Sequence, residues 1–142
     1  MLFGLYKPKI NHLLPGARVE HIGSSSVPGA ISKGDLDIFV GVNPHQVEYA
    51  ALALRGLGFQ EKENTLRTSE LCMLELNESN IALQVVANGS EYEFFIEFRN
   101  ALLNSTELLN AYNQLKKNCA CCNETEYREI KSKFILEVLN KA

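Results

Sequence analysis

Two short motifs in the first third of the sequence contain residues suited to phosphate chemistry. Gly23 and Ser24 follow directly on a run of alternating residues, and Asp35, the first acid of an Asp-x-Asp pair, follows Ser24 by eleven residues. A glycine lets the backbone approach a ligand closely, and successive backbone N–H groups at such a turn form a concave site for anions. The Gly23-Ser24 turn is therefore predicted to bind phosphate.

The acidic pair Asp35 and Asp37 predicts a metal site. Residues two apart in a strand share one face of a sheet, so both carboxylates lie together while Leu36 and Ile38 point into the core. Two adjacent like charges are costly unless a cation neutralises them, and Mg²⁺ prefers carboxylate oxygens with room for substrate phosphates. The pattern predicts Asp35 and Asp37 as Mg²⁺ ligands beside a nucleoside triphosphate, with Ser24 at its phosphates.

Neighbouring polar residues each admit two roles. Ser25 either caps the turn ahead of Val27 or joins Ser24 in contacting phosphate. Lys33 either holds a phosphate or offsets the acidic pair as an exposed charge. His21, at the end of a predicted strand, is either a core histidine hydrogen-bonded to backbone or a catalytic base.

Helix starts are marked by short polar residues followed three positions later by Glu or Gln. The helix that starts at Asn43 is predicted to reach about Arg55, where Gly56 and Gly58 end it. The other three starts predict three helices in the C-terminal third. The four pairs are Asn43/Gln46, Ser90/Glu93, Asn104/Glu107 and Asn123/Glu126.

Strands are predicted where β-branched residues alternate between turn residues. The last two predicted strands, Leu71–Leu76 and Ile81–Ala87, form a hairpin, because the connection 77–80 is polar and of hairpin-loop length. Leu74 and Leu83 would then share a buried face. With a helix before the first strand, these elements predict an α/β (α+β) fold: a mixed sheet covered by helices mainly on one side. The predicted strands are Arg18–Ile22, Leu36–Val42, 59–62, Leu71–Leu76 and Ile81–Ala87.

Composition narrows the class of protein. The 142 residues, 46% hydrophobic and 22% charged, are typical of one globular domain spanning 1–142, and the net charge of -3 argues against an extended nucleic-acid surface. No apolar run approaches the ~18 to 20 residues of a membrane helix and no signal peptide is evident, so we expect a cytoplasmic protein. The cysteines, Cys72 and the group Cys119, Cys121 and Cys122, are expected to be reduced rather than zinc-bound.

The motifs resemble the GrpB-like branch of the nucleotidyltransferase superfamily, whose folds are like that of DNA polymerase beta. The resemblance covers about residues 15 to 140, and it implies a nucleotidyltransferase-type sheet, bound Mg²⁺ and nucleoside triphosphate, and transfer of a nucleotidyl group to an unidentified acceptor. It rests on His-Ile-Gly-Ser-Ser-Ser-Val-Pro-Gly at 21–29, Lys-Gly-Asp-Leu-Asp-Ile at 33–38 and Ala-Leu-Gln-Val-Val at 82–86, with further matches at 98–102, 112–116 and 127–131.

The resemblance also raises the expectation that Lys116, Arg128 and Lys131 face phosphates, although a solvated helix face is the ordinary explanation for such charges. Transferring members of the superfamily usually carry a third carboxylate on a central strand. Here Gln84 stands where that acid is expected, and Glu75 on the preceding strand is a possible substitute. An active transferase, a catalytically inactive nucleotide- or partner-binding module, and a subunit completed by a partner therefore remain open.

Overall fold

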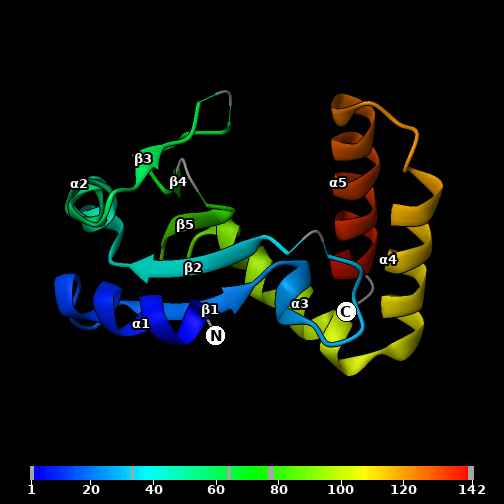
Figure 1. The fold of residues 1–142 in the computed structure, drawn as a ribbon, viewed down its shortest axis with the longest axis horizontal. Helices are drawn as coiled ribbons and strands as arrows, with labels where there is room; N and C mark the ends of the chain where they lie inside the picture. Colours follow the sequence, from blue (N-terminus) through cyan, green and yellow to red (C-terminus); the bar gives the residue numbers. More distant parts are fainter. Residues whose placement is uncertain (1, 33, 64, 77–78, 141–142) are drawn as a thin grey trace.

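The computed structural model describes residues 2–32, 34–63, 65–76 and 79–140. Lys33 and two residues of the predicted hairpin loop, Asn77 and Glu78, thus lie outside the described residues. Figure 1 shows a central sheet with helices α1 and α2 at one end and helices α4 and α5 side by side at the other.

The sheet has five strands in the order β1-β2-β5-β4-β3. Strands β2 and β5 pair in parallel, and the other neighbours pair antiparallel. Four strands have the bounds that β-branched alternation predicts, whereas β3 is two residues shorter than the predicted 59–62. The strands are β1 (Arg18–Ile22), β2 (Leu36–Val42), β3 (Gln60–Glu61), β4 (Leu71–Leu76) and β5 (Ile81–Ala87).

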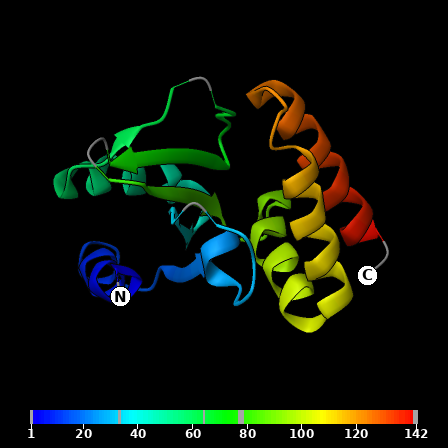
Figure 2. The same cartoon turned by 45° about the vertical axis from the view of Figure 1, so that its right-hand side comes forward.

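The C-terminal third is helical, as predicted, and α3 leads from the sheet to α4 and α5 (Figure 2). Within the described part of the chain, none of the helices combines the length and apolar character needed to cross a membrane. The α-helices are α1 (Leu2–Leu13), α2 (Val47–Leu54), α3 (Phe94–Asn104), α4 (Thr106–Asn118) and α5 (Glu124–Asn140), and the 3₁₀ turns are η1 (Ser24–Ser26), η2 (Pro44–Gln46), η3 (Arg55–Leu57) and η4 (Glu91–Glu93).

The predicted helix starts differ in detail. Asn123 caps α5 as predicted, since its Oδ1 accepts a hydrogen bond of 2.8 Å from the backbone N–H of Glu126. Helix α4 is instead capped by Ser105, one residue later than predicted, because α3 continues through Asn104. Asn43 and Ser90 directly precede the 3₁₀ turns η2 and η4, which continue into α2 and α3, so helical segments begin where predicted. Neither residue makes the predicted side-chain cap, and the first turn is 3₁₀ and not α-helical.

Both faces of the sheet are buried. Alternation along β2 places Ile38 and Val40 in the larger core with α1 and α2, and it places Phe39 in a second core with residues of η4 and α3. The expectation of a sheet covered mainly on one side is therefore wrong near α3. Leu74 and Leu83 pair across the β4–β5 hairpin and are fully buried, as predicted.

Candidate functional site

Asp37 and Gly23 are brought together by the pairing of β1 with β2. Asp37 lies opposite Ile22, the last residue of β1, so the next residue, Gly23, passes directly over the carboxylate. Gly23 has φ 76 and ψ -177, a backbone conformation open essentially to glycine alone. A Cβ at this position would lie 2.4 Å from Oδ2 of Asp37. The glycine of the motif is therefore required by the acidic residue as well as by any ligand.

The carboxylate of Asp37 lies in a surrounding that disfavours its charge. Burial is the largest influence on Asp37 and raises its pKa. The charge of Lys131 lowers this pKa, the charge of Asp35 raises it, and Lys62 and a side-chain hydrogen bond from Gln84 lower it by smaller amounts. Asp35 is exposed and precedes β2 instead of beginning it. The structure nevertheless places the predicted pair close enough for the charge of Asp35 to act on Asp37.

A divalent cation fits this pair, because it would offset both the half-buried charge of Asp37 and its repulsion by Asp35. A third acid is not beside them: among the described residues no His, Cys, Asp or Glu joins the pair to form a group of three. Glu75 shares the face of Asp37 but is separated from it by β5, where Ala82 pairs with both residues. Gln84, by contrast, makes a side-chain hydrogen bond to Asp37.

Ser24 connects the turn to the C-terminal helices. Lys116 of α4 donates hydrogen bonds to Oγ of Ser24 and, at 2.5 Å, to the carbonyl of Ile31. Its ammonium nitrogen lies 4.5 Å from the centre of the Tyr112 ring, and the Tyr112 hydroxyl is 3.5 Å from Oγ of Ser24. This cation thus lies beside the predicted phosphate-binding turn.

The other two predicted cations of the C-terminal helices differ from each other. Lys131 lines the cavity beside Asp37, whereas Arg128 forms an exposed ion pair of 2.7 Å with Glu124. Arg128 therefore has the solvated role, whereas Lys131 lies beside Asp37 in the cavity. Tyr127, one helical turn before Lys131, hydrogen-bonds to the hydroxyl of the buried Tyr112.

A cavity of about 220 Å³ opens between the sheet and the C-terminal helices. One wall is polar and includes the Gly23-Ser24 turn and Asp37, and the other is largely aromatic. The sequence analysis singled out none of the aromatic residues, although the spacing of three phenylalanines marks one apolar helix face. The cavity is lined by Ile22, Gly23, Ser24, Asp37, Gln84, Phe94, Phe95, Phe98, Arg99, Leu102, Tyr112, Lys131 and Ile135.

Ser25 and His21 lie apart from this cavity. Oγ of Ser25 is 2.9 Å from Nε2 of His21, whose ring stacks on Phe3 with centroids 5.2 Å apart. Burial and the nearby Arg99 lower the pKa of His21, so its ring is neutral at pH 7. The structure turns Ser25 toward His21, so the partner of that imidazole is a side-chain hydroxyl and not the backbone group of the core-histidine alternative.

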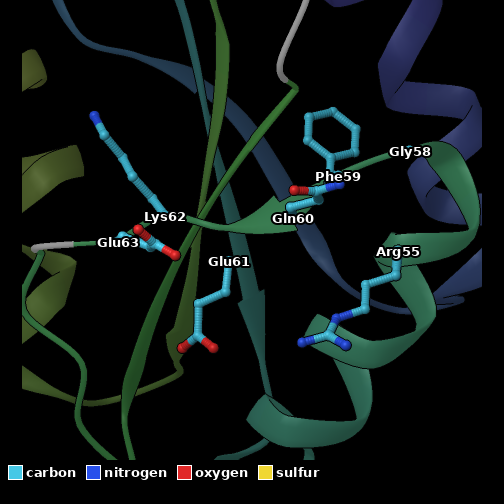
Figure 3. Close-up of a pocket in the computed structure, with 7 residues that line it drawn as sticks. All are labelled: Arg55, Gly58, Phe59, Gln60, Glu61, Lys62 and Glu63. Carbon is cyan, nitrogen blue, oxygen red and sulfur yellow. The ribbon is translucent and has the colours of Figure 1, made fainter.

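A larger and more open cavity of about 860 Å³ lies along β3, lined by residues between Arg55 and Glu63 (Figure 3). It is formed by one continuous stretch of chain and contains neither predicted motif. Lys62 points away from Arg55 in Figure 3, and its charge acts on Asp37. We therefore take the smaller cavity as the candidate site, with Lys62 as a cation that the sequence analysis did not identify.

Comparisons with known proteins identify the family of this chain. The sequence model of the GrpB protein family matches residues 2–141. A UPF0157 protein of Vibrio cholerae is 54% identical over 142 residues, covering 99% of this chain and 76% of the relative. A UPF0157 protein of Deinococcus radiodurans is 30% identical over 143 residues, covering 99% of this chain and 75% of the relative.

Two solved structures have similar folds. The crystal structure of the conserved protein GrpB from Enterococcus faecalis has a TM-score of 0.76 and 25% identity, covering 99% of this chain and 92% of that one. The Cid1 poly(U) polymerase with MgGTP bound has a TM-score of 0.56 and 18% identity, covering 75% of this chain and 35% of that one, a likeness of fold alone. The chain belongs to the GrpB family, and its fold is related to that of the nucleotidyltransferases.

Proposed function

We propose that this protein binds a nucleoside triphosphate with Mg²⁺ at the Gly23-Ser24 turn and transfers its nucleotidyl group to an acceptor. The observation that carries the proposal is the half-buried carboxylate of Asp37, held against Gly23 with Asp35 and Lys131 close by. Burying a carboxylate whose charge is disfavoured destabilises a fold, so its position is better explained by a bound cation than by packing.

Each part of the site has a defined role in the proposal. Asp35 and Asp37 hold Mg²⁺, which neutralises negative charge on the triphosphate when bound. The backbone N–H groups that follow Gly23 and the ammonium groups of Lys116 and Lys131 hold the phosphates. In the reaction an acceptor oxygen forms a bond to the α-phosphorus, the bond from that phosphorus to the bridging oxygen breaks, pyrophosphate leaves, and the acceptor proton passes to water.

The fold likeness supports this proposal, since the Cid1 structure of the same fold is bound to MgGTP. The acceptor is expected to be a small molecule or a local site on a larger one, because the net charge of -3 does not favour an extended nucleic-acid surface. No membrane partner is part of the proposal.

A second candidate function is nucleotide or partner binding without catalysis. It is favoured by Gln84, which contacts Asp37 where transferases of this fold usually have a third carboxylate. An amide binds Mg²⁺ more weakly than a carboxylate does, so transfer would be slow or absent while binding persisted. A partner subunit that supplied the missing acid would restore transfer.

Calorimetric titration with ATP, CTP, GTP and UTP, each with and without Mg²⁺, tests the proposal. We expect Mg²⁺-dependent binding of at least one nucleotide, lost in Asp37→Asn and retained in the exposed control Glu91→Gln. Failure of the wild type to bind any of the four refutes the proposal.

A label-transfer assay then distinguishes the two candidate functions. Nucleotides labelled at the α-phosphate are incubated with the protein and cell extract, and transferred label is followed. Transfer that Asp37→Asn abolishes establishes an enzyme, because a passive binding module produces none. Binding without transfer supports the inactive module, and sizing the protein alone and in extract then tests for a partner subunit.

A further inference from the structure

The amide of Gln84 has one unmet hydrogen-bonding atom inside the site cavity. Gln84 is 9% exposed and lines the cavity, and its Oε1 finds no donor within the described part of the chain. The amide N–H group of Gln84 donates to the carboxylate of Asp37, a contact that stabilises the ionised form of that carboxylate and leaves Oε1 as the unmet acceptor. A buried carbonyl oxygen without a donor is costly, so a ligand group that donates a hydrogen bond fits this position.

The cavity wall beside Gln84 suits a flat apolar group. Phe94 and Phe95 are half-buried, their ring centroids are 4.4 Å apart at an interplanar angle of 44°, and both line the cavity together with Phe98. Phenylalanine faces that are left open in a cavity bind planar or alicyclic groups. The volume of about 220 Å³ is below the ~300 to 1,000 Å³ of typical ligand sites, so it holds a small molecule or one end of a larger one.

Gln84 lies on the far side of the acidic pair from the phosphate-binding turn. Strand β1, which leads into Ser24, and strand β5, which carries Gln84, flank β2 on opposite sides, with Asp37 between them. In phosphoryl transfer the attacking and leaving oxygens lie roughly in line, on opposite sides of the phosphorus. A molecule bound at Gln84 is therefore on the side from which the acceptor attacks.

We propose that the end of this cavity at Gln84 is the acceptor subsite, and that the acceptor is a small alcohol whose hydroxyl donates to Oε1 of Gln84 while its flat apolar body packs on Phe94 and Phe95. The assignment as acceptor rests on the proposed nucleotidyl transfer. The binding of such an alcohol does not, because it uses neither nucleotide nor metal.

Phenol and anisole are a matched pair of probes for this subsite, since both carry the same flat ring and phenol alone has a hydroxyl donor. Their affinities are measured by ligand-detected NMR titration of the full chain without nucleotide or Mg²⁺. We expect phenol to bind about tenfold more tightly than anisole, the effect of satisfying one buried acceptor. Equal affinities, or no binding of either probe, overturn the proposal.

Two substitutions locate the effect. Gln84→Met keeps the volume of the side chain but removes the acceptor, so it should abolish the preference for phenol, while the exposed Gln114→Met should keep it. Phe95→Leu should weaken both probes alike. Thermal unfolding verifies that the variants are folded. If a variant does not fold, the ratio of phenol to anisole affinity in the wild type still tests the proposal. A preference that persists in a folded Gln84→Met variant overturns the proposal.

Addition of the nucleotide and Mg²⁺ tests the role of the subsite. We expect phenol and nucleotide to bind together, whereas mutual displacement means that the cavity belongs to the nucleotide and refutes an acceptor subsite. If phenol binds through Gln84 but no nucleotide binds, the proposed transferase function fails and the acceptor assignment fails with it. The alcohol-binding cavity is then established by itself.

Discussion

Lys116 donates a hydrogen bond to Ser24 across 92 positions of the sequence. The contact joins α4 to the turn that follows β1, and a second bond from the same ammonium group reaches the carbonyl of Ile31. The cation is thereby held in one place before any ligand arrives, so less side-chain entropy is lost when a phosphate binds.

Replacement of Lys116 or Lys131 by Met is expected to weaken Mg²⁺-nucleotide binding about tenfold each, because a charge-assisted contact to phosphate is lost. The loss should shrink at high salt, where exposed charges are screened. Calorimetry at two salt concentrations measures both effects. Lys117→Met, on an exposed position of the same helix, is the control, and equal affinities in all three variants contradict the assignment.

Gly23→Ala is expected to lower the free energy of unfolding by about 1–3 kcal/mol, since alanine is strained at φ 76 and ψ -177, and to abolish nucleotide binding. Its Cβ would displace the carboxylate of Asp37. Urea unfolding and nucleotide titration measure the two effects.

Gly16→Ala separates the effect of backbone strain from that of displacing the Asp37 carboxylate. Gly16 also has a positive φ, of 88, but a Cβ there meets no atom within 4 Å. This variant should be destabilised yet bind nucleotide as the wild type does. A Gly23→Ala protein that binds normally would show that Asp37 needs no such room.

Asp37→Asn is expected to stabilise the ligand-free protein at pH 7 by about 1 kcal/mol, as relief of a strained functional position commonly does. The pKa of Asp37 is raised above its ordinary 3.8 by burial. Because the folded state then binds the proton more tightly than the unfolded state, the contribution of Asp37 to stability is fully present below 3.8 and is lost as pH rises through the raised pKa.

Urea unfolding of the wild type and the variant over a range of pH gives this dependence. The advantage of Asp37→Asn should vanish toward pH 3.8 and grow as pH rises. Asp35→Asn, at an exposed position, should change stability little. A wild type that is more stable than Asp37→Asn at pH 7 would contradict the burial effect.

Cys72 is expected to resist alkylation in the folded protein. Burial raises its pKa from 9.0 to about 11, so its reactive thiolate fraction at pH 8 falls by on the order of a hundredfold. The exposed Cys121 should react first with iodoacetamide, and all four cysteines should react in urea. Peptide mass spectrometry reads the sites, and labelling of native Cys72 as fast as Cys121 would be inconsistent with its burial.

Local patterns explain why much of the fold is predictable. Strand bounds follow from the alternation of β-branched residues, which depends on near neighbours. The local conformation of the Gly23-Ser24 and Asp-x-Asp motifs follows from the types and spacing of their own residues. The cap of α4 is less determined, because Asn104 and Ser105 are adjacent and both suit that role. The length of α3 decides between them.

The composition of the site is less predictable, because it depends on contacts between distant elements. The positions of Lys116 and Lys131 were expected only from the resemblance, and Lys62 and the phenylalanines of α3 carry no local signal of a role beside Asp37. The choice between Gln84 and Glu75 rests on strand order. Strand β5 places Gln84 in contact with Asp37 and separates Glu75 from it.

The parallel pairing of β2 with β5 also has a consequence for folding. These strands, Leu36–Val42 and Ile81–Ala87, are joined through α2, β3 and β4, so bringing them together requires closure of a long loop. Such non-local pairing is slow compared with the formation of local contacts. Gln84 cannot reach Asp37 until that step is complete, so during synthesis on the ribosome the acidic pair stays without this partner until β5 has emerged.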